Sequence, residues 1–204
     1  MKTNIETAQG WVAGESAATD PAMRVFRGLP YAQPPLGDLR WKPPQPVEPW
    51  TDLHAADAFS LPCWQTHSED AFVWSRGVFE RSEDCLYLNV WSPEDADHLP
   101  VMVWFHGGAH TGGWGHNLLF DGTNLAGLGV VLVTINYRLG PWGFLAHPLL
   151  SEESPFNSSG NYGLLDKIAA LKWVQQNIEA FGGDASNVTV FGQSAGSQSI
   201  CALM

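Results

Sequence analysis

Positive charge is scarce in this sequence. Only 10 Lys and Arg stand against 21 Asp and Glu among its 204 residues, which gives a net charge of −11 at pH 7. A polyanion would be repelled from most of such a surface. The composition therefore argues against a nucleic-acid partner.

Long apolar runs are missing as well. A membrane-spanning helix needs about 20 predominantly apolar residues, whereas the longest candidates here are the short stretches 101–105 and 130–133. The first 14 residues also lack the basic segment followed by an apolar stretch that marks a secretory signal. We therefore predict no membrane span and a cytoplasmic location.

Cysteine is rare, with Cys63, Cys85 and Cys201 as its only instances. Three are too few for a disulfide scaffold, and an odd number leaves at least one thiol unpaired within the chain. Stability must then come from a core, for which 45% hydrophobic and 15% charged residues are suitable. The length predicts one domain over residues 1–204.

Seven prolines fall between residues 30 and 49, where they forbid long helices and central strands. They are Pro30, Pro34, Pro35, Pro43, Pro44, Pro46 and Pro49. From this cluster we expect the whole segment up to Glu83 to wrap around the fold and not to form its scaffold.

The pattern changes after residue 86. Short β-rich runs at 87–91, 101–105 and 130–135 predict buried strands. Residues 161–181 then show a helical period, with Asn161 as a cap and Gly182-Gly183 as an end. The residues expected on its buried face are Leu164, Ile168, Leu171 and Ile178. With a further strand at 187–191, this order predicts an α/β fold with a parallel crossover.

The motif Gly192-Gln193-Ser194-Ala195-Gly196 directly follows that last predicted strand and precedes a segment able to form a helix. A serine on such a sharp turn is lifted above the sheet, and small neighbours let the strand and helix converge. Alone, the motif could equally be a small-residue turn that packs a helix on a strand. In this context we interpret Ser194 as a nucleophile.

A second Gly-rich element, His106-Gly107-Gly108-Ala109, follows the strand 101–105 with no intervening residue. The tetrahedral intermediate of an ester carries an oxyanion, and backbone N–H groups can converge on it only where side chains are small. Where a serine stands on a strand-to-helix turn, such a loop acts together with the N–H that follows the nucleophile. We therefore nominate Gly108, Ala109 and Ala195 as the oxyanion hole.

Several motifs resemble the type-B carboxylesterase and cholinesterase family over nearly the whole chain. Residues 181–196 resemble its serine signature and residues 83–93 its second signature. Further matches in the same order lie at 26–32, 34–35, 136–140 and 143–145. The resemblance implies an α/β-hydrolase fold, present here as the N-terminal portion through the nucleophile turn.

This resemblance also implies a function and two structural pairs. It implies hydrolysis of small carboxylic esters through a serine acyl-enzyme, without a cofactor. It implies a disulfide between Cys63 and Cys85, although a reducing cytosol would keep these thiols free. It further implies a buried ion pair between Arg40 and Glu83, which by default would be two separate surface charges.

Two details bear on the mechanism. Gln193 stands where many family members have Glu, so no anion flanks the serine and uncharged esters are favoured over choline-like cations. His106 and His110 flank the oxyanion loop, where we expect them to brace the loop or face solvent and not to act as the catalytic base.

No Asp, Glu or His follows Ser194 in residues 195–204. In this fold the acid and then the base come after the serine, so we expect this chain to be an N-terminal fragment that is inactive by itself. Two alternatives stay open: a non-catalytic interaction module on an esterase scaffold, and a lipase-type esterase. The oligomeric state and the acyl and alcohol preferences are not predicted by the sequence.

Overall fold

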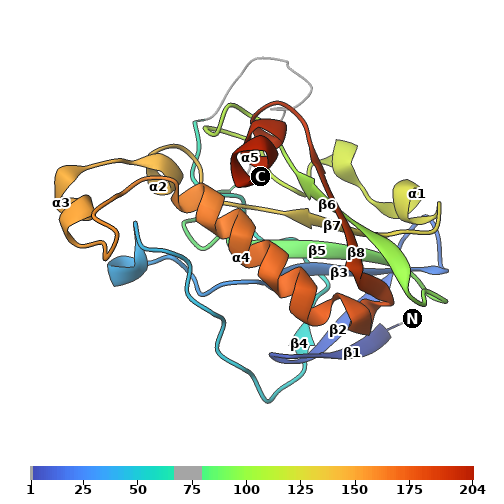
Figure 1. Ribbon diagram of the computed structural model, residues 1–204. Coiled ribbons are helices and arrows are strands. Elements are labelled where there is room, and N and C mark those ends of the chain that lie inside the picture. The colour runs from blue at the N-terminus through green and yellow to red at the C-terminus, as the bar shows by residue number, and fades with distance from the viewer. Residues whose placement is uncertain (1, 67–79) are drawn as a thin grey trace.

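A computed structural model describes residues 2–66 and 80–204. These residues form one eight-stranded mixed sheet in the order β1-β2-β3-β5-β7-β6-β8, with β4 paired to β2 off this path (Figure 1). The strands are β1 (Lys2–Thr7), β2 (Gly10–Ser16), β3 (Met23–Pro30), β4 (His54–Ala55), β5 (Tyr87–Pro93), β6 (Leu99–Phe105), β7 (Val131–Ile135) and β8 (Gly183–Gly192).

The N-terminal segment contributes strands, contrary to our expectation that all of it would wrap. The strands β1, β2 and β3 are antiparallel neighbours, and β3 also pairs with β5. The reason is local: Pro30 is the last residue of β3, so the proline cluster begins where the strand ends. Only the stretch after β3 has the irregular course that prolines impose.

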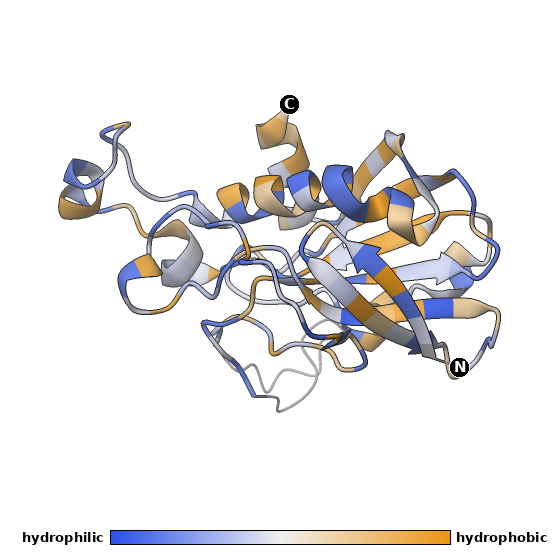
Figure 2. Ribbon diagram, turned by 90° about the horizontal axis from the view of Figure 1, so that it is seen from below, coloured by the Kyte–Doolittle hydropathy of each residue, from blue (hydrophilic) through white to orange (hydrophobic). Residues whose placement is uncertain are grey.

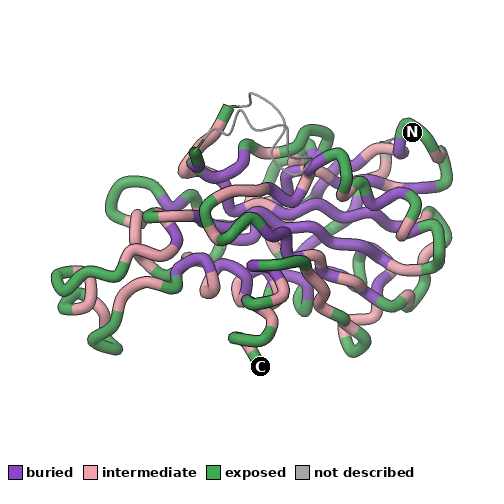
Figure 3. Tube along the Cα trace, turned by 90° about the horizontal axis from the view of Figure 1, so that it is seen from above, coloured by how far each residue is buried: buried purple, intermediate pink, exposed green. Residues whose placement is uncertain are grey.

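The predicted strands of the second half are present as β5, β6, β7 and β8. The strand β6 runs parallel to both β7 and β8, whereas β5 is antiparallel to β7. All five residues of β7 are buried, while burial alternates along β6 at Val101, Val103 and Phe105. Figure 3 shows these buried strands through the centre of the molecule. Because parallel strands end at the same sheet edge, the residues that follow β6 and β8 meet.

In the described part of the chain, five helices accompany the sheet: α1 (Thr123–Ala126), α2 (Gly140–Phe144), α3 (Pro148–Glu152), α4 (Tyr162–Asn177) and α5 (Ala195–Leu203). Short 3₁₀ turns occur at Gly37–Leu39, Leu118–Phe120 and Ile178–Phe181. The long helix α4 crosses one face of the sheet (Figure 1). None of the helices within residues 2–66 and 80–204 is long and apolar enough to cross a membrane.

Helix α4 ends at Asn177, four residues before the predicted end, and it buries a different face. Gly182 takes the left-handed conformation at the end of the turn that follows the helix, whereas the Asn161 side chain makes no capping bond. Asp166 and Lys167 are fully buried, while Leu164, Ile168 and Leu171 are only partly buried. Polar and apolar residues are mixed around the helix (Figure 2). Our expected face was therefore wrong in three of its four positions.

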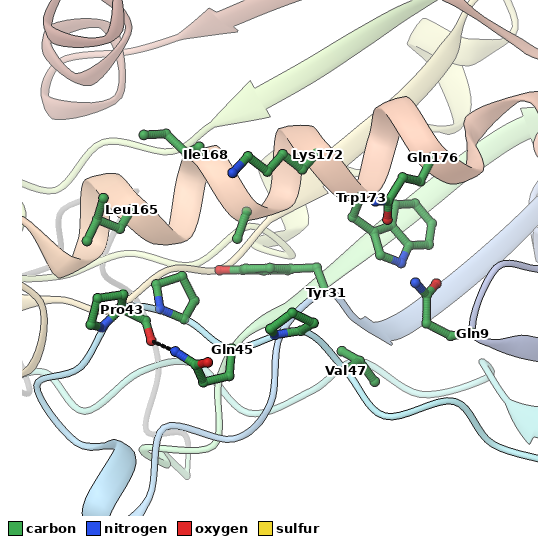
Figure 4. A pocket seen from close by; sticks show the side chains of 13 residues that line it. Gln9, Tyr31, Pro43, Gln45, Val47, Leu165, Ile168, Lys172, Trp173 and Gln176 are labelled. Atoms are coloured by element: carbon green, nitrogen blue, oxygen red, sulfur yellow. Dashed lines mark hydrogen bonds between the residues drawn. The ribbon is translucent and has the colours of Figure 1, made fainter.

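An ion pair explains this rotation of α4. Arg138 donates to Asp166 from Nε at 2.9 Å and from Nη2 at 2.7 Å, and its backbone N–H donates to the same carboxylate. This pair fixes Asp166 against the sheet. The side chains of Leu165 and Ile168 then line a surface groove opposite Pro43 and Val47, with Tyr31 between them (Figure 4).

Candidate active site

Ser194 sits on a strained turn between the end of β8 and the start of α5. Its φ is 53° and its ψ is −121°, a combination that non-glycine residues rarely adopt. The turn is closed by the Gly196 N–H, which donates to the Gln193 carbonyl at 2.9 Å. Ser194 itself is exposed. The geometry is that of a serine presented to a substrate on a strand-to-helix turn.

The glycines of this turn are required by the neighbouring strand. A Cβ on Gly192 would lie 2.8 Å from the Phe105 carbonyl oxygen, and one on Gly196 would overlap that same oxygen. Phe105 is the last residue of β6 and pairs with Gly192. We expected the clash from strand β8 and helix α5, but the nearest atoms belong to β6.

The loop after β6 lies directly against the nucleophile turn. A Cβ on Gly107 would stand 2.7 Å from the Gln193 carbonyl oxygen and 3.2 Å from the Ser194 Cβ. Sequence reasoning missed Gly107, since its role is contact with the turn and not donation to the oxyanion. The only available signal was its place between His106 and Gly108 directly after a strand.

The carbonyl groups of this loop determine where its N–H groups point. The Gly108 carbonyl accepts from the N–H groups of Thr111 at 2.9 Å and Gly112 at 3.0 Å. The Gly107 carbonyl is bonded to His106 Nδ1 at 2.7 Å. In a planar trans peptide the N–H points opposite the carbonyl. The N–H groups of Ala109 and Gly108 therefore point away from these internal partners.

These two N–H groups have no hydrogen-bond acceptor among the described residues. Gly108 and Ala109 have φ of 112° and 53° and line a cavity of about 430 Å³ together with Gly107 and Ser194. Ala195 is fully buried and is the first residue of α5, where N–H groups have no partner within the helix. Convergence of all three N–H groups on one point stays a prediction.

His106 braces the loop, in line with our expectation. Its ring stacks on Tyr137 at 4.3 Å between centroids, and the Tyr137 hydroxyl donates to the His106 carbonyl. Burial lowers the pKa of His106 to about 3, so the ring is neutral at pH 7 and donates from Nδ1 to Gly107. Burial also lowers the pKa of His110, which packs on Phe144.

Cys63 and Cys85 lie together in the core as free thiols. Hydrogen bonding with Cys63, then burial, raises the pKa of the Cys85 thiol well above its ordinary value. The Leu139 N–H donates to Cys63 Sγ at 3.3 Å. The two side chains are thus neighbours, and the disulfide between them stays a prediction.

Arg40 and Glu83 form the ion pair that the resemblance implies, but it is only partly buried. Nε and Nη2 of Arg40 donate to the two Glu83 oxygens at 2.5 and 2.9 Å, a bidentate geometry. The Arg40 side chain is 39% exposed and the Glu83 side chain is 18% exposed. Among the described residues the fully buried ion pair is Arg138–Asp166, at 3% and 0% exposure, which sequence reasoning did not identify.

No cluster suited to a metal ion occurs within residues 2–66 and 80–204, where no three His, Cys, Asp or Glu side chains gather.

Comparison with known proteins gives consistent matches. A model of the Carboxylesterase family matches residues 1–204. The chain is 49% identical over 194 residues to the fumonisin B1 esterase of Sphingopyxis macrogoltabida, covering 94% of this chain. It is 48% identical over 204 residues to the para-nitrobenzyl esterase of Bacillus subtilis, covering 98%.

Solved structures agree with these relatives. A PNB esterase superimposes over 100% of this chain with a TM-score of 0.89 and 45% identity, and a carboxylesterase of Geobacillus stearothermophilus over 97% with a TM-score of 0.85 and 42% identity. The matches cover only 35% and 40% of the two relatives, and 41% and 40% of the two solved chains. The chain thus spans about two fifths of the proteins it resembles.

Proposed function

The chain belongs to the carboxylesterase family, and from that premise we propose that Ser194 is the nucleophile of a carboxylic ester hydrolase. Residues 1–204 would form the N-terminal part of a single α/β-hydrolase domain. The observation that carries the proposal is the strained, exposed Ser194 beside two backbone N–H groups that have no acceptor in the described residues.

The proposed reaction has two halves. The Ser194 oxygen attacks the ester carbonyl carbon while a base takes its proton, and the carbonyl oxygen becomes an anion. The N–H groups of Gly108, Ala109 and Ala195 donate to that oxyanion, and loss of a single donor of this kind typically costs about 10²–10³ in kcat. The alcohol departs, and water then releases the acid from the acyl-enzyme.

The base and its acid partner are proposed to come from elsewhere in the complete protein. Burial holds the pKa of His106 at about 3 and that of His116 at about 4, so both are weak bases. Residues 195–204 contain no Asp, Glu or His. The chain covers only 35% and 40% of two of its relatives. In this fold the acid and then the base follow the serine along the chain, so we propose that both lie in the later part of the complete protein.

Small uncharged esters are the proposed substrates. Gln193 is exposed beside Ser194 and carries no charge to attract a cationic alcohol. Trp114 and Phe120 also line the cavity and provide apolar surface for an organic acyl or alcohol group. Because relatives are named for fumonisin B1 and para-nitrobenzyl esters, those esters are the first to assay.

The proposed chemistry needs no cofactor. A cytoplasmic location and the lack of a nucleic-acid partner stay predictions.

A non-catalytic binding module is the second candidate, and the backbone argues against it. A binding surface has no need of a non-glycine residue held at φ 53° and ψ −121°, which costs free energy to maintain. Lipase-type action uses the same serine chemistry and stays an alternative within the proposed class.

The test uses the natural full-length protein that contains residues 1–204. Wild type, Ser194→Ala and the exposed control Ser158→Ala are assayed for p-nitrophenyl acetate hydrolysis and for labelling by a fluorophosphonate. We expect wild type and Ser158→Ala to react equally and Ser194→Ala to lose both signals. Hydrolysis that survives Ser194→Ala would contradict the mechanism, and an unreactive wild type would favour the binding module.

A further inference from the structure

The side chain of Gln65 forms hydrogen bonds with both the N–H and the carbonyl group of Gly113. Its Oε1 accepts the Gly113 N–H at 2.7 Å, and its Nε2 donates to the Gly113 carbonyl at 3.0 Å. The same Nε2 donates to the Cys63 carbonyl at 3.1 Å. Gln65 is only 9% exposed. Its amide therefore joins two segments 48 residues apart with both polar atoms in use.

Gly113 in turn lies against the base of the oxyanion loop. A Cβ there would stand 2.5 Å from His106 Nδ1 and 2.6 Å from the Gly107 carbonyl oxygen. These are the two atoms whose hydrogen bond orients the Gly107–Gly108 peptide. The position of Gly113 therefore limits how that peptide can rotate.

Gly112, the residue before Gly113, orients the Gly108–Ala109 peptide. The Gly112 N–H donates to the Gly108 carbonyl, which directs the Ala109 N–H away from Gly112. Gly112 also lies close to the amide of Gln65, since a Cβ on Gly112 would be 3.3 Å from Oε1. One glutamine side chain thus supports the segment that aims both N–H groups.

We propose that Gln65 is a positioning residue for the oxyanion hole, a role that rests on the function proposed above. Gln65 also lines the cavity beside Ser194, but its side chain bonds to Cys63 and Gly113 and not to Ser194. Its proposed action is to fix the turn from Gly108 to Gly113. When the turn is free to shift, the N–H groups of Gly108 and Ala109 lose their alignment, and the transition state loses more stabilisation than the bound substrate does.

The role needs a side chain with a donor and an acceptor at this length. Met fills a similar volume but offers neither group, so both polar groups of Gly113 would be left unpaired. Glu keeps the acceptor for the Gly113 N–H, but its ionised form places a second acceptor against the Gly113 carbonyl. When protonated, Glu regains an O–H donor.

The experiment compares Gln65→Met, Gln65→Glu and Gln45→Met in the natural full-length protein. Gln45 is an exposed glutamine whose side chain bonds only to the nearby Pro43 carbonyl among the described residues, so it controls for loss of an amide. We expect Gln65→Met to lower kcat by about 10- to 100-fold with KM within about twofold of wild type. Gln45→Met should match wild type in both constants.

The pH profile separates positioning from general loss of structure. The activity of Gln65→Glu relative to wild type should rise as pH falls from 8 to 5, because protonation restores the donor to Gly113. A flat ratio, or a Gln65→Met variant with unchanged kcat, would overturn the proposal. If Gln65→Met fails to fold, the pH profile of Gln65→Glu decides the matter alone.

Hydrogen exchange distinguishes this inference from the function on which it rests. An inactive wild type would contradict the esterase proposal, and Gln65 is then judged by exchange at the Gly113 amide. We expect that amide to be protected in wild type and Gln45→Met and to exchange at least tenfold faster in Gln65→Met. Equal exchange in all three proteins would overturn the role of Gln65.

Discussion

Gly107 and Ser194 approach so closely that a methyl group added to the first would press on the second. The Cβ of such an alanine would lie 3.2 Å from the Ser194 Cβ and 2.7 Å from the Gln193 carbonyl oxygen. The oxyanion loop and the nucleophile turn are thus in direct backbone contact, because β6 and β8 are parallel and end together.

We predict that Gly107→Ala lowers kcat/KM for p-nitrophenyl acetate by at least about 100-fold in the full-length protein. The added methyl must push the loop away from the turn, and the N–H donors move with the loop. Gly37→Ala is the control, since nothing lies within 4 Å of its Cβ, although its φ of 54° costs about 1 kcal/mol of stability. Equal kinetics for both variants would contradict the contact.

This contact shows which residues of the candidate site could be predicted from the sequence and which could not. The order of β6, loop, β8 and turn follows from the apolar runs and from glycines placed directly after them, so Ser194, Gly108 and Ala109 could be named in advance. Gly107 and Gln65 could not, because their roles depend on atoms that are distant in sequence. No periodicity reports that the amide of Gln65 reaches Gly113.

The errors have a similar origin. Counting apolar residues at helical spacing favoured Leu164 and Ile168 for the core, but the Arg138–Asp166 pair rotates α4 the other way. In the same manner, the prolines after residue 30 hid three strands that precede them. For α4, an ion pair between residues distant in sequence outweighed the helical pattern of apolar residues. For the N-terminal segment, the effect of the prolines was wrongly extended to residues that precede them.

Lys167 should make stability depend on pH. Its Nζ lies 3.1 Å from the centroid of the Tyr137 ring and donates to the Gly163 carbonyl, and burial lowers its pKa from 10.5 to about 7. Between these values the unfolded chain binds a proton that the folded protein does not. This uptake lowers the free energy of unfolding as pH falls, by at most about 1.4 kcal/mol per unit.

We therefore predict that Lys167→Met is most stabilised relative to wild type near neutral pH and that the difference shrinks toward pH 10. Below pH 7 the difference should be constant. Urea unfolding across this range measures it, with the exposed Lys172→Met on the same helix as the control. A difference that does not change with pH would show that the ammonium of Lys167 keeps its ordinary pKa.

The three thiols should differ in reactivity. Cys201 is exposed on α5, whereas Cys63 and Cys85 are buried, and hydrogen bonding with Cys63 together with burial raises the pKa of Cys85. Because the thiolate is the reactive form, a maleimide should label only Cys201 in the reduced native protein and all three after denaturation. Peptide mass mapping identifies the labelled residues.

Oxidation provides the second half of that test. If Cys63 and Cys85 form the bridge that the family resemblance implies, Cys201 should be the one labelled cysteine among residues 1–204 of the oxidised and denatured protein. The bridge would stabilise the fold by about 3 kcal/mol by restricting the unfolded chain. Three labelled cysteines after oxidation would contradict the pairing.

Residues 1–204 expressed alone should hydrolyse p-nitrophenyl acetate far more slowly than the full-length protein, by about 10⁴-fold. Burial makes His106 and His116 weak bases, no histidine follows Ser194 in residues 195–204, and a serine without its base keeps the low reactivity of an alcohol. The edge strand β8 pairs only with β6 among the described strands and is largely half-exposed, so the isolated chain should also self-associate. Parallel assays of the two proteins, with light scattering of each, test both statements. An isolated chain as active as the full-length protein would show that its own residues supply the base, and it would redirect the search to the seven histidines before Ser194.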